Sequence, residues 1–128
     1  MKLLLDTHLL IWTVSGSERL SQEARTLLDD RDNELFFSPI SFWEIAIKRG
    51  LDRPDFLFDG QLLRDSLLEK GFWEITLTTD HAMGVGSLPL LHKDPFDRLL
   101  IAQALIEGVT LLTSDRMVSQ YRSSVRLV

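Results

Sequence analysis

Short runs of apolar residues alternate along this chain with longer segments in which apolar residues recur at the spacing of one helix face. The runs expected to form strands are 2–6, 34–38, 72–78, 109–115 and 125–128. The segments expected to form helices are 7–14, 21–30, 41–50, 59–71 and 94–107, with short helical pieces after residue 79 and at 116–121. Strand followed by helix followed by strand favours right-handed crossovers and a mostly parallel sheet. We therefore expect a three-layer α/β/α fold with helices on both faces of a central sheet.

Length and composition narrow the class of protein. A chain of 128 residues buries about two-thirds of its unfolded surface in one core, and no linker or repeat divides it, so we expect a single domain over residues 1–128. The absence of cysteine excludes disulfides and thiolate metal sites. No apolar stretch approaches the roughly 20 residues of a membrane span, and Asp6 interrupts the apolar start without a signal cleavage site after it. We expect a cytoplasmic protein with no membrane association.

The net charge of −5 argues against a protein that coats nucleic acid with a broad basic surface. It leaves open an enzyme whose acids are gathered around a metal ion. The positions of the acids in the fold therefore say more about the function than the net charge does.

Residues 92–105, HKDPFDRLLIAQAL, place two aspartates around a proline at the start of an apolar helix. Asp94 fits the N-cap, Pro95 fits the first turn, and Asp97 fits the third position, where the helix dipole favours an acid. Both aspartates could serve only to begin the helix. By the same reasoning, Ser41 and Glu44 fit a capping box at the start of a helix over 41–50.

Four acids close or follow separate predicted elements. Asp6 ends the first strand, Glu44 lies at the start of the helix after the second, Asp97 begins a later helix, and Asp115 ends TLLTSD. Ligands of open parallel sheets bind beyond the carboxyl ends of the strands, so these acids are candidates for one crevice. Carboxylates gathered there repel one another unless a cation is present, and Mg²⁺ and Mn²⁺ prefer oxygen ligands. Such a site activates water and neutralises charge on a phosphodiester.

Hydroxyl side chains flank these acids and are candidates to orient them or to bind phosphate, although hydroxyls at helix starts also serve as caps. The residues assigned this supporting role are Thr7, Ser41, Thr113 and Ser114, together with Asp94, whose main role is the helix cap. The histidines His8, His81 and His92 lack the spacing of a zinc site, and His92 fits a surface loop better than a substrate contact.

The aromatic residues are interpreted as core and interface anchors rather than base-stacking platforms. They are Trp12, Trp43, Trp73, Phe42, Phe56 and Phe58. The segment RPDFLF (53–58) is the most plausible exposed apolar patch and suggests a protein partner.

The motifs LLLDTHLLIW, SPISFWEIAIK, LPLLHKDPFDRLLIAQAL and LLTSD follow one another across nearly the whole chain. In this order and spacing the chain resembles PIN-domain ribonucleases, specifically VapC-type toxins of toxin–antitoxin pairs. The resemblance implies a PIN-like fold and Mg²⁺- or Mn²⁺-dependent endonucleolytic cleavage of RNA that leaves a 5′-phosphate and a 3′-hydroxyl. It also implies a homodimer and inhibition by a VapB-like antitoxin. The catalytic, metal-binding acids that it assigns are Asp6, Glu44, Asp97 and Asp115.

Basic side chains near these acids are candidates for contacts with the RNA backbone, with surface salt bridges as an equal alternative. They are Lys48, Arg49, Arg98 and Arg116. Two other classes of function stay open from the residues alone. One is an aspartyl-phosphate phosphotransfer domain with Asp6 as nucleophile, although TLLTSD offers no lysine of the kind that such sites use. The other is a non-catalytic interaction module whose acids hold a structural ion or cap helices.

Overall fold

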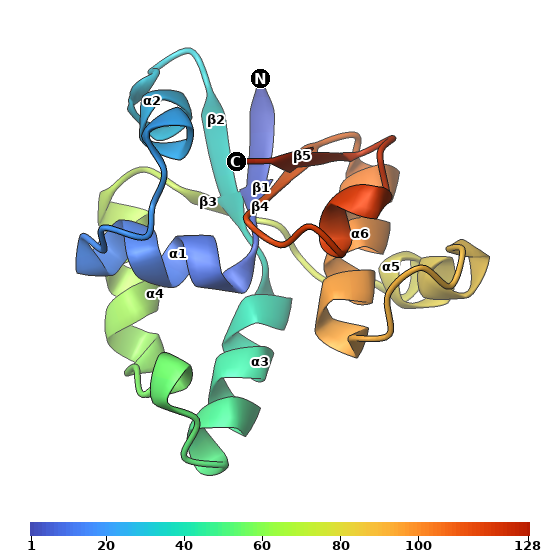
Figure 1. Ribbon diagram of the computed structural model, residues 1–128, viewed down its shortest axis with the longest axis horizontal. Coiled ribbons are helices and arrows are strands. Elements are labelled where there is room, and N and C mark those ends of the chain that lie inside the picture. The colour runs from blue at the N-terminus through green and yellow to red at the C-terminus, as the bar shows by residue number, and fades with distance from the viewer.

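The computed structural model describes residues 1–128 and contains one five-stranded sheet with the strand order β3-β2-β1-β4-β5 (Figure 1). Every pair of neighbouring strands is parallel, which confirms the expected parallel sheet. The strands are β1 (Lys2–Leu5), β2 (Glu34–Phe37), β3 (Trp73–Glu74), β4 (Thr110–Thr113) and β5 (Val125–Leu127).

Helices cover both faces of this sheet, as the alternating pattern predicted (Figure 1). The α-helices are α1 (Thr7–Ser15), α2 (Gln22–Asp29), α3 (Pro39–Gly50), α4 (Gly60–Glu69), α5 (Thr79–Gly84) and α6 (Pro95–Glu107). Single 3₁₀ turns lie at Pro54–Phe56, Val85–Ser87 and Val118–Gln120. None of the helices combines the length and the apolar character that crossing a membrane requires.

The central strand β1 divides the core into two halves. Leu3 and Leu5 point into a cluster formed with α1, α2 and α4. Leu4 points the other way, into a cluster formed mainly by α6 and the turn at Val118–Gln120. This alternation is the period of two that a strand imposes on its side chains, and it explains why a run of consecutive leucines is buried on both sides.

Helix α3 starts earlier than the sequence analysis predicted. Ser38 is its N-cap, because the Ser38 hydroxyl accepts a hydrogen bond from the Ile40 N–H at 3.1 Å, and Pro39 occupies the first turn. Ser41 therefore lies inside the helix, and the predicted capping box between Ser41 and Glu44 is wrong. This frees both side chains to face the carboxyl edge of the sheet.

Two other expectations fail in part. The predicted strand 72–78 is reduced to Trp73–Glu74, because β3 is an edge strand that pairs only with β2. In the segment RPDFLF, Phe56 is buried rather than exposed, and only Leu57 stands out as an exposed apolar side chain. Trp43 and Trp73 are 51% and 64% exposed, so of the two roles expected of the aromatic residues, core or interface anchor, the interface role stays a prediction for these two.

Candidate active site

The carboxyl ends of β1 and β4 and the helices around them form a polar cleft of about 160 Å³. No hydrophobic side chain lines it. Asp6 follows β1, Asp115 follows β4, Glu44 comes from α3, and Asp97 comes from the first turn of α6. The structure thus brings together the acids that the sequence analysis placed in one crevice. Its other lining residues are Thr7, His8, Lys48, His92, Asp94 and Ser114.

Asp6 is held rigidly at the start of α1. One carboxylate oxygen accepts a hydrogen bond from the Leu9 N–H at 3.0 Å, and the other accepts one from the Thr113 hydroxyl at 2.5 Å. Burial raises the pKa of Asp6 from 3.8 to about 6; these two hydrogen bonds lower it, and Glu44 and Asp115 raise it further by repulsion. The side chain is nearly inaccessible and pairs with no basic group, so its negative charge is poorly compensated by the protein alone.

Asp97 faces the same cleft from α6. Burial raises its pKa to about 6; a hydrogen bond with His92 lowers it, while Asp94, Asp6 and Glu44 raise it. Asp94 itself is the N-cap of α6, because its carboxylate accepts a hydrogen bond from the Asp97 N–H at 3.0 Å. The two aspartates of DPFD therefore differ in their roles: the first caps the helix, and the second presents its carboxylate to the cleft.

Glu44 is fixed by a small network between α1 and α3. The Thr7 hydroxyl is hydrogen-bonded to the Glu44 carboxylate at 2.6 Å and to the Ser41 hydroxyl at 3.0 Å, and all three side chains are buried. The other Glu44 oxygen accepts from the Lys48 ammonium at 2.5 Å. Lys48 also lies 4.6 Å from the centre of the Phe56 ring. Thr7 and Ser41 thus orient an acid of the cleft.

The end of β4 supplies the last group of polar residues. The Thr113 hydroxyl links two acids, because it donates to Asp6 and accepts from the Asp115 N–H at 3.0 Å. Asp115 accepts a hydrogen bond from the Met117 N–H at 2.8 Å and is otherwise exposed to the cleft. Ser114 lines the cleft beside it.

The basic candidates are distributed unevenly. Lys48 lines the cleft, and Arg116 follows Asp115 on the surface. Arg98 is engaged elsewhere, because its guanidinium donates to the carbonyls of Val85, Pro89 and His92. The guanidinium of Arg49 donates to the Phe58 carbonyl at 2.8 Å, away from the acids. Arg98 and Arg49 therefore make hydrogen bonds within the protein, and the contact of the four basic side chains with RNA stays a prediction.

His92 lies in a loop, as expected, but this loop brings its side chain to the cleft. Its imidazole Nε2 lies 2.7 Å from Asp97 Oδ2, and its side chain is only 14% exposed. Single ligand atoms of His92, Asp97 and Asp115 lie within 4.8 Å of one another. The sequence places His92 only five residues before Asp97, which is compatible with a contact between the two side chains. The same spacing is also found in surface loops that make no such contact.

The donor set of the cleft fits a divalent cation of the Mg²⁺ or Mn²⁺ type. Asp6 and Asp97 are buried carboxylates that repel each other and their acidic neighbours, and Lys48 is bound to Glu44 rather than to either of them. Hard divalent ions prefer carboxylate oxygens and remove such repulsion. The absence of any cysteine, and a lining with only two histidines, His8 and His92, do not fit a structural zinc site.

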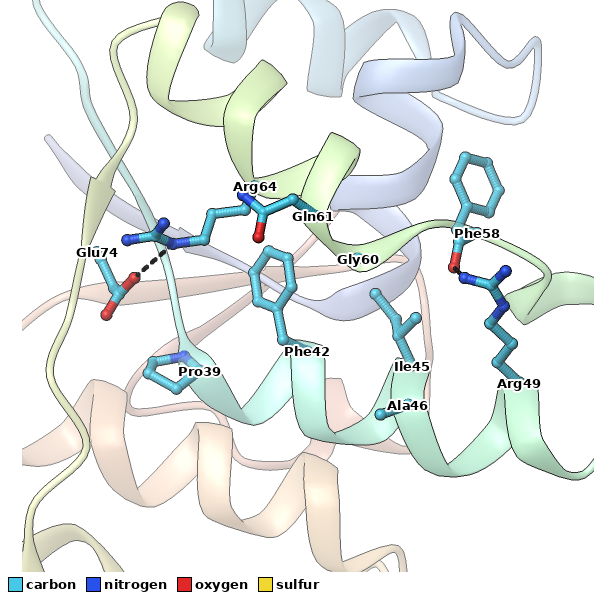
Figure 2. Close-up of a pocket in the computed structure, with 10 residues that line it drawn as sticks. All are labelled: Pro39, Phe42, Ile45, Ala46, Arg49, Phe58, Gly60, Gln61, Arg64 and Glu74. Carbon is cyan, nitrogen blue, oxygen red and sulfur yellow. Dashed lines mark hydrogen bonds and ion pairs between the residues drawn. The ribbon is translucent and has the colours of Figure 1, made fainter.

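A larger and more apolar pocket, of about 600 Å³, lies between α3 and α4 (Figure 2). Phe42, Ile45 and Phe58 form its apolar lining, while Arg49 and Arg64 stand toward its two ends (Figure 2). Arg64 is paired with Glu74 at 3.5 Å across the exposed edge of the sheet. This pocket is separate from the acidic cleft.

Comparison with protein families gives a match over almost the entire chain. The family model described as PIN domain matches residues 3–123. Ribonuclease VapC22 of Mycobacterium tuberculosis (strain ATCC 25618 / H37Rv) is 30% identical over 120 residues, which cover 93% of this chain and 91% of that protein.

Solved structures give the same fold. VapBC2 from Rickettsia felis, bound to a DNA fragment from its promoter, matches with a TM-score of 0.69 and 17% identity over 100% of this chain and 98% of that chain. A toxin–antitoxin complex from Klebsiella pneumoniae matches with a TM-score of 0.63 and 23% identity over 96% of this chain and 94% of that chain. At these identities the likeness is one of fold.

Proposed function

Because the chain belongs to the PIN domain family, we propose that it is a metal-dependent endoribonuclease and the toxin of a type II toxin–antitoxin pair. The relative that shares 30% of its residues is named a ribonuclease. Structures with the same fold are complexes of toxin with antitoxin. Both features support the proposal.

The observation that carries the proposal is the convergence of Asp6, Glu44, Asp97 and Asp115 on one cleft without an apolar wall. Buried carboxylates that raise one another's pKa are costly unless a cation neutralises them. Catalytic sites are the places where such an arrangement is retained. A domain whose acids only capped helices would not need to face them toward one another.

In this proposal, Asp6, Asp97 and Asp115 hold Mg²⁺ or Mn²⁺, with Glu44 acting directly or through water. A cation held there would neutralise charge at the scissile phosphate and would activate a water molecule for attack. The chain's own residues pre-organise the carboxylates. Thr113 and the Leu9 N–H fix Asp6, and Thr7 with Ser41 fixes Glu44.

The RNA lies along the open side of the cleft, where its phosphates approach positive charge. Lys48 is the basic residue within the cleft wall, and Arg116 lies beside Asp115. Ser114 lines the cleft, and we assign its hydroxyl to a hydrogen bond with a phosphate oxygen. Products with a 5′-phosphate and a 3′-hydroxyl are the outcome expected of such a site.

The test is cleavage of a structured RNA by purified protein, with Mg²⁺ and with EDTA. Asp97→Asn removes the charge of a proposed metal ligand while keeping its shape, and we expect cleavage to fall by at least a hundredfold. Asp94→Asn is the matched control in the same helix turn, because asparagine also caps helices, and it retains cleavage within a few-fold.

Equal cleavage by Asp97→Asn and wild type, at matched thermal stability, would show that Asp97 is not part of the site. Cleavage that persists in EDTA would remove the metal from the proposal. The first result tests whether Asp97 belongs to the site, and the second tests whether the cleavage needs a metal ion.

The antitoxin is proposed to place an amphipathic segment in the pocket between α3 and α4 (Figure 2). The apolar lining of Phe42, Ile45 and Phe58 accepts apolar side chains, and Arg49 and Arg64 complement acidic ones. The pocket adjoins the helix that carries Glu44, so a chain bound there can extend toward the cleft. A homodimer is expected as well, and sedimentation equilibrium measures it.

A further inference from the structure

His92 is joined to the acidic cleft by one short contact. Its Nε2 lies 2.7 Å from Asp97 Oδ2, and both side chains are mostly buried. An ionised carboxylate can only accept a hydrogen bond, so the imidazole nitrogen must be the donor. The other carboxylate oxygen, Asp97 Oδ1, takes no hydrogen bond from the protein and stays open to the cleft.

The loop that carries His92 is fastened to the rest of the molecule at several points. The Tyr121 hydroxyl accepts hydrogen bonds from the N–H groups of Leu91 and His92, each at 3.1 Å, and donates to the Pro89 carbonyl at 2.7 Å. Tyr121 is 5% exposed and packs in the core beneath the loop. One buried hydroxyl thus makes hydrogen bonds with three residues of the loop, Pro89, Leu91 and His92.

Arg98, from α6, contacts the same loop, and we call Tyr121 and Arg98 together the Tyr121–Arg98 clamp. Its guanidinium donates to the carbonyls of Pro89 and His92 at 3.1 and 3.3 Å and to the Tyr121 hydroxyl at 3.0 Å. Arg98 is the residue directly after Asp97, so the same helix turn carries the carboxylate and the clamp for the loop that covers it. The position of the imidazole relative to Asp97 is therefore set by the fold.

We propose that His92 is a positioning residue for the metal site: its Nε2–H holds Asp97 Oδ2, which would leave Oδ1 free to bind the cation. The Tyr121–Arg98 clamp fixes His92 in turn. This inference rests on the proposed function, because it takes Asp97 to be a metal ligand. Hydrogen bonds to ligating groups change metal affinity by about 10- to 100-fold when they are removed.

Calorimetric titration with Mn²⁺ alone, without RNA, measures this role. We expect His92→Phe, which keeps a ring but no donor, to bind Mn²⁺ at least tenfold more weakly than wild type. His92→Gln keeps an N–H donor and restores part of the affinity. Tyr121→Phe removes only the hydroxyl of the clamp and weakens binding by a smaller factor.

Asp97→Asn is the reference that separates the two proposals. If wild type binds Mn²⁺ and Asp97→Asn does not, but His92→Phe binds as tightly as wild type, the positioning role is overturned and the metal site stands. If wild type itself does not bind Mn²⁺, the proposed metal site is wrong, and the positioning role of His92 is overturned with it.

A spectroscopic signature distinguishes positioning from direct ligation. In protein labelled with ¹⁵N-histidine, the Nε2 of His92 keeps its proton when diamagnetic Mg²⁺ is added, because it continues to donate to Asp97. Loss of that proton on addition of Mg²⁺ would show that the imidazole binds the cation itself and would overturn the proposal.

Discussion

At the scale of single residues, the acidic cleft is a place where the protein tolerates poorly compensated charge. Asp6 is 5% exposed and makes no ion pair, and the only groups that lower its pKa are the Thr113 hydroxyl and the Leu9 N–H. Such an arrangement lowers the stability of the metal-free protein at neutral pH. This lower stability follows from holding the carboxylates close together in the arrangement that binds a cation.

The raised pKa of Asp6 predicts how stability depends on pH. The folded protein binds the Asp6 proton more tightly than the unfolded chain does. Protonation of Asp6 therefore stabilises the folded state, and this stabilisation is complete below pH 4 and is lost as the pH rises through about 6. The difference between 3.8 and about 6 corresponds to about 3 kcal/mol in the free energy of unfolding. In EDTA, Asp6→Asn is therefore expected to be more stable than wild type at pH 7, by up to about that amount.

Urea unfolding of both proteins between pH 4 and pH 8 measures the effect. The gap between variant and wild type should be small at pH 4, should widen as the pH rises from about 4 to about 6, and should stay constant above that. A gap that is the same at both ends of this range would contradict the assignment of a buried, destabilised carboxylate to Asp6.

Residue patterns revealed the acids but not their partners. Asp6, Glu44, Asp97 and Asp115 were found because each lies near the end of a strand or the start of a helix, which are local features of the sequence. The contacts of Arg98 and Tyr121 with the 85–92 loop connect segments far apart in the chain. Hydrogen bonds between distant segments produce no local pattern in the sequence. The sequence therefore predicts an RNA contact for Arg98 and gives no sign of its hydrogen bonds to the 85–92 loop.

At the scale of secondary-structure elements, local signals mark several helix ends. Asp94 caps α6, as predicted, and in the structure Asp59 caps α4 and Gly108 ends α6 with a positive φ of 67°. The start of α3 was missed because Ser38 with Pro39 and Ser41 with Glu44 offer competing local signals. Tertiary contacts of Ser41 and Glu44 with Thr7 decided between them. Strand β3 was overestimated because pairing, and not propensity, limits an edge strand.

The cap of α6 gives a prediction at this scale. Asp94→Ala removes the acceptor of the Asp97 N–H, and the loss of such a cap costs about 1 kcal/mol in the free energy of unfolding. Asp94→Asn should retain most of that stability. Chemical denaturation of the two variants, followed by circular dichroism, measures the difference. Equal stability of the alanine and asparagine variants would mean that the cap contributes nothing.

At the scale of the whole molecule, two separate surfaces have different characters. The acidic cleft lies at the carboxyl ends of β1 and β4, and the apolar pocket lies between α3 and α4 (Figure 2). Helix α3 contributes to both, with Glu44 in the cleft and Phe42 in the pocket. The two surfaces share no lining residue.

This arrangement predicts that partner binding and catalysis can be separated. Ala46 lines the pocket and is exposed, so Ala46→Glu should leave the fold intact while placing a negative charge against an acidic partner segment. We expect binding to the co-expressed antitoxin to weaken at least tenfold, measured by calorimetry, and RNA cleavage to stay within twofold of wild type. Ala46→Ser is the control without a charge.

Unchanged affinity of Ala46→Glu for the antitoxin would place the partner elsewhere on the surface. A parallel loss of cleavage would show that the pocket and the cleft are not independent. The alternation of strands and helices could predict the layers of this molecule, whereas the pocket depends on how α3 and α4 meet, which no single segment encodes.

If the converging acids make this protein an RNA-cleaving enzyme, expressing it will create new RNA ends. We propose to sequence RNA 5′ ends after expression of wild type and of Asp97→Asn at equal protein levels. We expect new, discrete 5′-phosphate ends that appear with wild type and are absent with the variant. The same ends in both samples, or none in either, would contradict it.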